Sequence, residues 1–64
     1  MELSRKKINI ALAQKEMTVT QLAKAYGVSR ARMNVILNQR EVTPVCAGRI
    51  AKALGCDVTE ILAD

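Results

Sequence analysis

Hydrophobic residues recur along the chain at intervals of three and four positions, the spacing of one face of an α-helix, and no segment shows the alternation of a strand. The first stretch runs from about Ser4 to Lys15. Ile8, Ala11 and Leu12 lie on its inner face, with Lys15 at the solvent edge. Since serine favours the position before a first helical turn, we expect a helix over residues 4–15, capped by Ser4.

A second helix is expected after Thr18, because Thr18 and Gln21 have the spacing of a capping box, in which each side chain bonds the other residue's amide. This helix covers about Val19 to Tyr26. Its inner face contains Leu22, Ala23 and Tyr26.

A sharp turn and a third helix follow. Gly27 ends the second helix in the left-handed conformation, Val28 is placed to tuck under the turn, and Ser29 caps the next helix. This third helix extends to about Asn38. Its inward residues are Met33, Ile36 and Leu37.

A threonine followed by proline, the preferred order at a helix start, begins a fourth helix over about Pro44–Leu54, which contains Gly48 and is closed by Gly55. Its main apolar contacts are expected at Val45, Ile50, Ala53 and Leu54. A short last helix covers about Val58 to Ala63. The fold class is therefore all-α, a compact bundle of about five short helices forming one domain over residues 1–64, with a helix-turn-helix at about 18–38.

The amino-acid composition indicates which side chains build the core. The chain contains one aromatic residue, Tyr26, so aliphatic side chains must build the core. Cys46 and Cys56 fit small apolar core residues of a reducing compartment; a disulfide or a zinc site is the weaker alternative, because two thiols without histidine do not supply four ligands.

No apolar run approaches about 18 residues and no signal peptide is evident, so we expect a cytoplasmic protein without membrane contact.

The positive charge lies in one part of the sequence. Residues 1–40 carry eight Lys or Arg and two Glu, whereas residues 41–64 carry two basic and four acidic residues, for a net charge of +4. A nucleic-acid binder with a separate partner-facing side would show this division. Chance clustering on a solvated surface explains it equally well.

The third helix has the side chains that major-groove recognition requires. The short helix before it and the glycine turn between the two leave this third helix protruding from the fold. Its outward residues are Arg30, Ala31, Arg32, Asn34, Val35 and Asn38. Arg30 can bond guanine O6 and N7 in bidentate fashion, Asn34 can bond adenine, and Ala31 and Val35 suit a thymine methyl. The alternative is that Arg30 and Asn34 are ordinary solvated helix residues.

The strings LAKAYGVS (Leu22–Ser29) and IAKALGCDVTEIL (Ile50–Leu62), separated by a helix and a polar turn with proline, resemble the Cro/cI-type, lambda-repressor-like (XRE) helix-turn-helix family of phage and bacterial transcription regulators. The resemblance covers about Leu12 to Leu62. It implies a recognition helix over residues 29–38 that enters the major groove of double-stranded DNA. The implied base contacts are Arg30, Ala31, Asn34 and Val35, and the implied phosphate contacts are Arg32, Asn38 and Arg40.

The chain departs from the family pattern at three positions. Val19 stands where the family usually has a glutamine that bonds the DNA backbone, so either this phosphate contact is missing or Thr18 and Thr20 supply it. Leu37 replaces a glutamate that often pairs with an arginine at the position of Leu12. We therefore expect an apolar contact between these two leucines. Gln39 replaces a glycine that caps the third helix, so the following loop is expected to differ in shape.

The resemblance also implies a homodimer, weak or formed only on DNA, bound to a palindromic operator with half-sites about one helical turn apart. The expected dimer contact is the acidic C-terminal end, at Val58, Ile61 and Leu62; alternatively these three close the core. Repression is the expected activity. Competing functions are an antitoxin or partner-binding adaptor, with a toxin as partner, and an excisionase-like DNA-bending protein. An enzyme is excluded by the lack of histidine, paired carboxylates and a phosphate-binding loop, and no cofactor or metal is expected.

Overall fold

Four hydroxyl side chains begin the four α-helices of the computed structural model, which describes all 64 residues. Each hydroxyl oxygen accepts a hydrogen bond of 3.1 Å from the backbone amide three residues later. The capping residues are Ser4, Thr18, Ser29 and Thr43. Each cap satisfies an amide that has no partner inside the helix. All four predicted helix starts are therefore confirmed.

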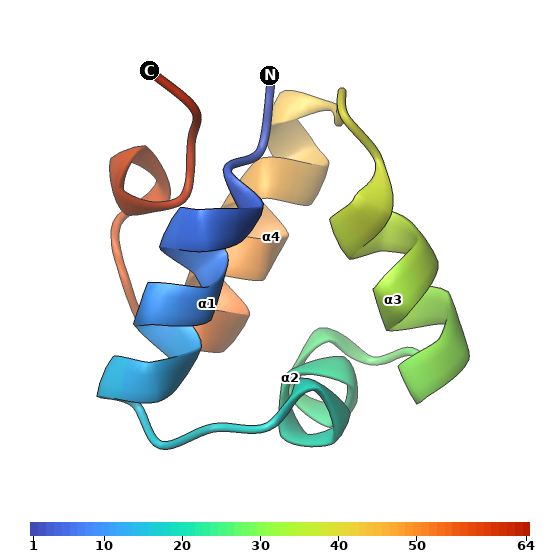
Figure 1. Ribbon diagram of the computed structural model, residues 1–64. Coiled ribbons are helices and arrows are strands. Elements are labelled where there is room, and N and C mark those ends of the chain that lie inside the picture. The colour runs from blue at the N-terminus through green and yellow to red at the C-terminus, as the bar shows by residue number, and fades with distance from the viewer.

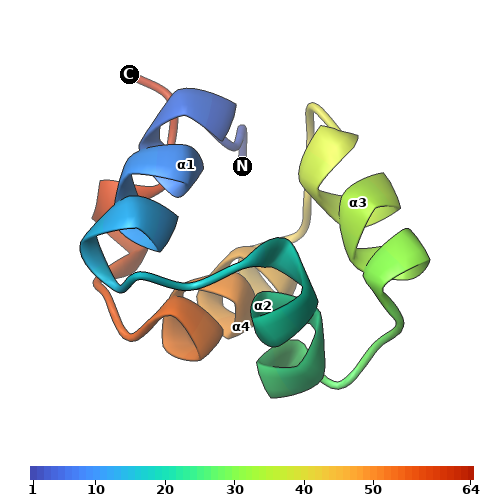
Figure 2. The same cartoon turned by 60° about the horizontal axis from the view of Figure 1, so that its bottom comes forward.

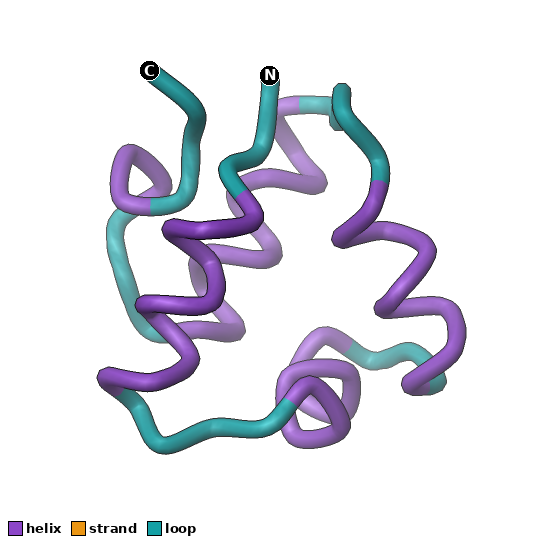
Figure 3. The backbone as a smooth tube through the Cα atoms, viewed as in Figure 1, coloured by secondary structure: helices purple, strands orange, loops and turns teal.

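The helices follow one another without an intervening strand (Figures 1 and 3). They are α1 (Arg5–Gln14), α2 (Val19–Tyr26), α3 (Arg30–Asn38) and α4 (Pro44–Leu54), and a single turn of 3-10 helix, η1 (Val58–Glu60), comes last. α2 packs against both α3 and α4, and η1 packs against α4 and α1. The predicted all-α bundle is confirmed.

Buried aliphatic side chains from all four α-helices meet in one core. Six of them have almost no exposed surface, and these are Ile8, Leu22, Met33, Ile50, Leu54 and Ile61. No polar residue is buried. Leu12 and Leu37 both belong to this core, and their direct contact stays a prediction.

The first three residues of the chain lie between two other segments, and two of them form isolated β-bridges. Glu2 pairs with Glu41 and Leu3 pairs with Leu62, both in antiparallel fashion. Leu3 and Val42, each 8 % exposed, join the core through this pairing. The two ends of the chain therefore lie side by side, near the loop between α3 and α4 (Figure 1).

Two predictions about the C-terminal half are wrong. The expected last helix over Val58–Ala63 is only the η1 turn, because the Ser4 amide bonds the Ile61 carbonyl at 2.8 Å and the following residues pair with the N-terminal segment. Val45, expected in the core, is 73 % exposed. It precedes Ala47 by two residues, which turns it about 200° around the helix from the buried face.

Both cysteines are free thiols that pack half-buried against the core. Burial raises the pKa of the Cys56 thiol, and the nearby Glu60 carboxylate acts in the same direction. Their packing agrees with the interpretation as small core residues, and the structure pairs neither of them in a disulfide. None of the helices has the length and apolar character needed to cross a membrane.

Candidate nucleic-acid interface

The connection between α2 and α3 is a three-residue turn. Gly27 has φ of +99°, a left-handed conformation that glycine adopts without a Cβ clash. The amides of Gly27 and Val28 both donate to the Ala23 carbonyl, at 2.8 and 3.0 Å, and the Val28 side chain packs against the core. Ser29 then caps α3. The predicted helix-turn-helix is present, with the predicted turn chemistry.

α3 stands at the periphery of the molecule, on the side away from α1 (Figures 1 and 2). Its inner residues Met33, Ile36 and Leu37 are at most 6 % exposed and fasten it to the core. This burial leaves the opposite face of a nine-residue helix uncovered.

The uncovered face of α3 contains every base-contacting residue expected from the sequence. Arg30, Ala31 and Val35 are exposed, and Asn34 is half-buried at the edge of the face. Arg30 forms no ion pair, and the three ion pairs of the structure lie elsewhere. The guanidinium of Arg30 is thus free for an external acceptor. An unpaired arginine, a short apolar side chain and an amide on one protruding helix are the donors and methyl contacts that base edges accept.

The start of α2 offers two hydroxyl groups to solvent. Thr18 and Thr20 are both exposed. The Thr18 oxygen accepts from the Gln21 amide, and the Gln21 side-chain oxygen accepts from the Thr18 amide at 2.9 Å, which completes the predicted capping box. Val19 between the two threonines packs half-buried against the core. A valine at this position therefore serves packing, while its hydroxyl neighbours face outward.

The end of α3 has the altered shape expected from Gln39. This residue has φ of −72° and ψ of 132°, an extended conformation, in place of a left-handed cap. Asn38 and Arg40 on either side of it are exposed, and Arg32, six residues before Asn38, is exposed as well. Of these residues only Arg40 has a charged partner: its Nε lies 3.5 Å from Oε2 of Glu2.

A buttress formed by Tyr26, Cys46 and Arg49 fixes the end of α2 against α4, and the sequence did not indicate it. The Arg49 guanidinium lies 4.2 Å from the centre of the Tyr26 ring and donates to the Tyr26 carbonyl at 3.1 Å. The Tyr26 hydroxyl donates to Sγ of Cys46 at 3.5 Å, and this bond, more than burial, raises the pKa of the phenol. Because the turn into α3 begins directly after Tyr26, the buttress holds the base of the helix-turn-helix.

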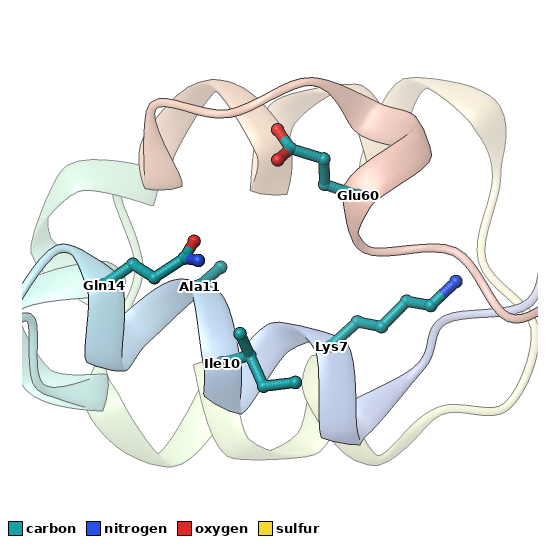
Figure 4. Close-up of a pocket in the computed structure, with 5 residues that line it drawn as sticks. All are labelled: Lys7, Ile10, Ala11, Gln14 and Glu60. Carbon is teal, nitrogen blue, oxygen red and sulfur yellow. The ribbon is translucent and has the colours of Figure 1, made fainter.

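An open groove lies between α1 and η1 (Figure 4). Ala11 and Gln14 point across it toward Glu60, and Ile10 on its rim is 48 % exposed. Lys7 turns toward the C-terminal segment, where its ammonium donates to the Leu62 carbonyl at 2.9 Å and to Asp64 at 2.8 Å. This bond lowers the pKa of the Asp64 carboxyl. The groove contains no cluster of unpaired polar groups.

The residues expected at a dimer contact differ in their exposure. Ile61 has no exposed surface, which agrees with the alternative that it closes the core. Val58 and Leu62 are half-buried and pack against the core with one side.

The comparisons with known proteins agree with this geometry. A family model described as Cro/C1-type HTH DNA-binding domain matches residues 7–64, which is most of the chain. No curated protein and no solved structure gives a match.

Proposed function

The chain belongs to the Cro/C1-type helix-turn-helix DNA-binding family, and from this premise we propose that it is a sequence-specific transcriptional regulator, a repressor that acts in the cytoplasm by occupying its operator. The observation that carries the proposal is the uncovered face of α3, where Arg30 lies exposed without a partner above the buried residues Met33, Ile36 and Leu37. A helix fastened on one side and polar on the other is what major-groove insertion requires.

Base recognition is assigned to one face of α3. Arg30 bonds guanine O6 and N7, and Asn34 bonds adenine N6 and N7 one turn later. Ala31 and Val35 contact thymine methyl groups. The 49 % exposure of Val35 supports this role, because an exposed valine on a helix gains free energy when a methyl group covers it.

Phosphate contacts are assigned to the residues around α3. Thr18 and Thr20 at the start of α2 hold the DNA backbone on one side of the groove. Arg32, Asn38 and Arg40 hold it along the flank and at the end of α3. All five side chains are exposed. These contacts fix the position of α3 on the duplex and carry most of the salt dependence of binding.

Two copies are proposed to bind a palindromic site whose half-sites lie roughly 34 Å apart. Val58 and Leu62 are the proposed contact between the copies, since both retain part of their apolar surface. So small a surface makes for a weak dimer that forms on DNA.

The test is selection of bound duplexes from random DNA, followed by affinity measurements on single variants. Arg30→Ala should weaken binding by about 1–3 kcal/mol and relax the preference at one base pair, whereas Arg40→Ala should weaken binding to all sequences alike and reduce the salt dependence. Lys6→Ala is the matched control, because it removes an exposed positive charge from α1, away from α3. Unchanged affinity and unchanged site preference in both arginine variants would refute the assignment.

A further inference from the structure

The backbone of the N-terminal segment is fixed beside the loop that follows α3. The Val42 amide donates to the Met1 carbonyl at 2.9 Å, and Glu2 pairs with Glu41 in an isolated bridge. On its other side, the Glu2 carbonyl accepts from the Ala63 amide at 2.9 Å. Glu2 is therefore held from both sides, next to the loop that carries Arg40.

This fixed position brings a carboxylate to the arginine that is proposed to anchor DNA. Oε2 of Glu2 lies 3.5 Å from Nε of Arg40. The Arg40 side chain is 88 % exposed and that of Glu2 is 43 % exposed, so water and external anions reach the pair. A solvent-exposed ion pair is weak enough for a phosphate to replace its carboxylate.

We propose that Glu2 is an intramolecular competitor of DNA phosphate for Arg40 and thereby lowers the affinity of the protein for duplex DNA of any sequence. This inference rests on the proposed function, in particular on Arg40 as a phosphate contact. A phosphate that approaches Arg40 must displace the Glu2 carboxylate or share the guanidinium with it. Because phosphate contacts carry no sequence information, the competition affects all sequences equally.

Glu41 provides a matched comparison within the same structure. It lies next to Arg40 in the chain, and its carboxylate binds the Met1 ammonium at 3.1 Å instead of the arginine. Glu2→Gln and Glu41→Gln remove the same charge from the same part of the surface. Only the first removes the competitor of Arg40.

The experiment measures the affinity of the full chain for a duplex selected from random DNA and for a scrambled duplex, over a series of salt concentrations. The Glu2→Gln variant should bind both duplexes about two- to five-fold more tightly at low salt, as expected for the loss of one exposed pair. The slope of log affinity against log salt should steepen by a fraction of the ~0.9 that one phosphate contact contributes. Glu41→Gln should have a smaller effect. In an Arg40→Gln background, Glu2→Gln should have none.

Four results would overturn the proposal. A gain from Glu2→Gln that persists in the Arg40→Gln background, or an equal gain from Glu41→Gln, would indicate general repulsion between the carboxylates and DNA. No gain from Glu2→Gln, together with a loss from Arg40→Gln, would overturn the competition alone and leave the proposed function intact. Wild-type affinity in Arg40→Gln would refute the anchoring role of Arg40 and the competition with it. All exchanged side chains are solvent-exposed, so each variant should keep the wild-type melting temperature.

Discussion

Replacing Ile61 with alanine separates the two interpretations of the C-terminal end, core closure and dimer contact. The Ile61 side chain has no exposed surface, and its carbonyl holds the amide of Ser4, which caps α1. Truncation of a fully buried isoleucine to alanine costs about 2–5 kcal/mol. A domain of 64 residues has a total free energy of unfolding of roughly 3–10 kcal/mol. The variant should therefore lose a large part of its stability, with a fall in melting temperature of roughly 10 °C or more.

Thermal unfolding followed by far-ultraviolet circular dichroism measures this loss, at a concentration where the wild-type protein is monomeric. Ile10→Ala is the matched control, because it removes the same atoms from a side chain that is 48 % exposed. Its free energy of unfolding should change by less than about 0.5 kcal/mol. An Ile61→Ala variant that melts like the wild type, and differs only in self-association, would refute the assignment of this residue to the core.

Four other substitutions test the turn, the buttress and the cap of η1, where the Asp57 side chain accepts a hydrogen bond from the Thr59 amide. Gly27→Ala should lower the free energy of unfolding by about 1–2 kcal/mol, because alanine is strained at the positive φ of this position. Gly48→Ala, in open space within α4, should raise it by about 0.5–1 kcal/mol. Urea unfolding measures both changes, and equal effects would contradict the backbone argument. Cys46→Ala should lower the pKa of the Tyr26 phenol toward its ordinary value, because it removes the hydrogen bond that is the main cause of the raised pKa. Ultraviolet titration of the single tyrosine measures this pKa. An unchanged midpoint would exclude the hydrogen bond. Hydrogen bonds from Thr59 lower the pKa of the Asp57 carboxyl, so its contribution to stability is present above the ordinary carboxyl pKa and is lost as the pH falls through the lowered value. Asp57→Asn should therefore reduce the decline in melting temperature below about pH 4. An equally steep decline in this variant would speak against the cap.

The helices that the sequence predicted correctly depend on local chemistry. Each of the four begins with a hydroxyl residue whose oxygen reaches an amide three positions on, and two end at a glycine with positive φ, Gly27 and Gly55. Such interactions lie within one helical turn and are visible as a spacing in the chain.

The errors and omissions concern contacts between distant parts of the chain. Leu3 and Val42 become buried only because segments about 40 and 60 residues apart pair with the N-terminus, and this pairing also ends the helix expected after Val58. No local pattern indicates such a pairing. The error at Val45 had a local cause, since its position on the helix turns it away from the face that Ala47 and Ile50 bury.

The outward face of α3 could be predicted because its buried residues have helical spacing, and the remaining positions must face outward. The buttress at Tyr26 could not, since Arg49 reaches it from 23 residues away. The ion pair of Glu2 with Arg40 likewise depends on the position of the N-terminal segment. Local sequence thus indicates which side chains of α3 face outward, and tertiary structure determines what packs against them or pairs with them.

The pairing of Glu2 and Leu3 with distant segments also bears on the order of folding. The Ile61 carbonyl and Leu62, which fix Ser4 and Leu3, lie nearly sixty residues later in the chain. The hairpin of α2 and α3 depends instead on contacts close in sequence, and such contacts form faster than distant ones. We therefore expect this hairpin to form early in folding and the pairing of the N-terminal segment to come last.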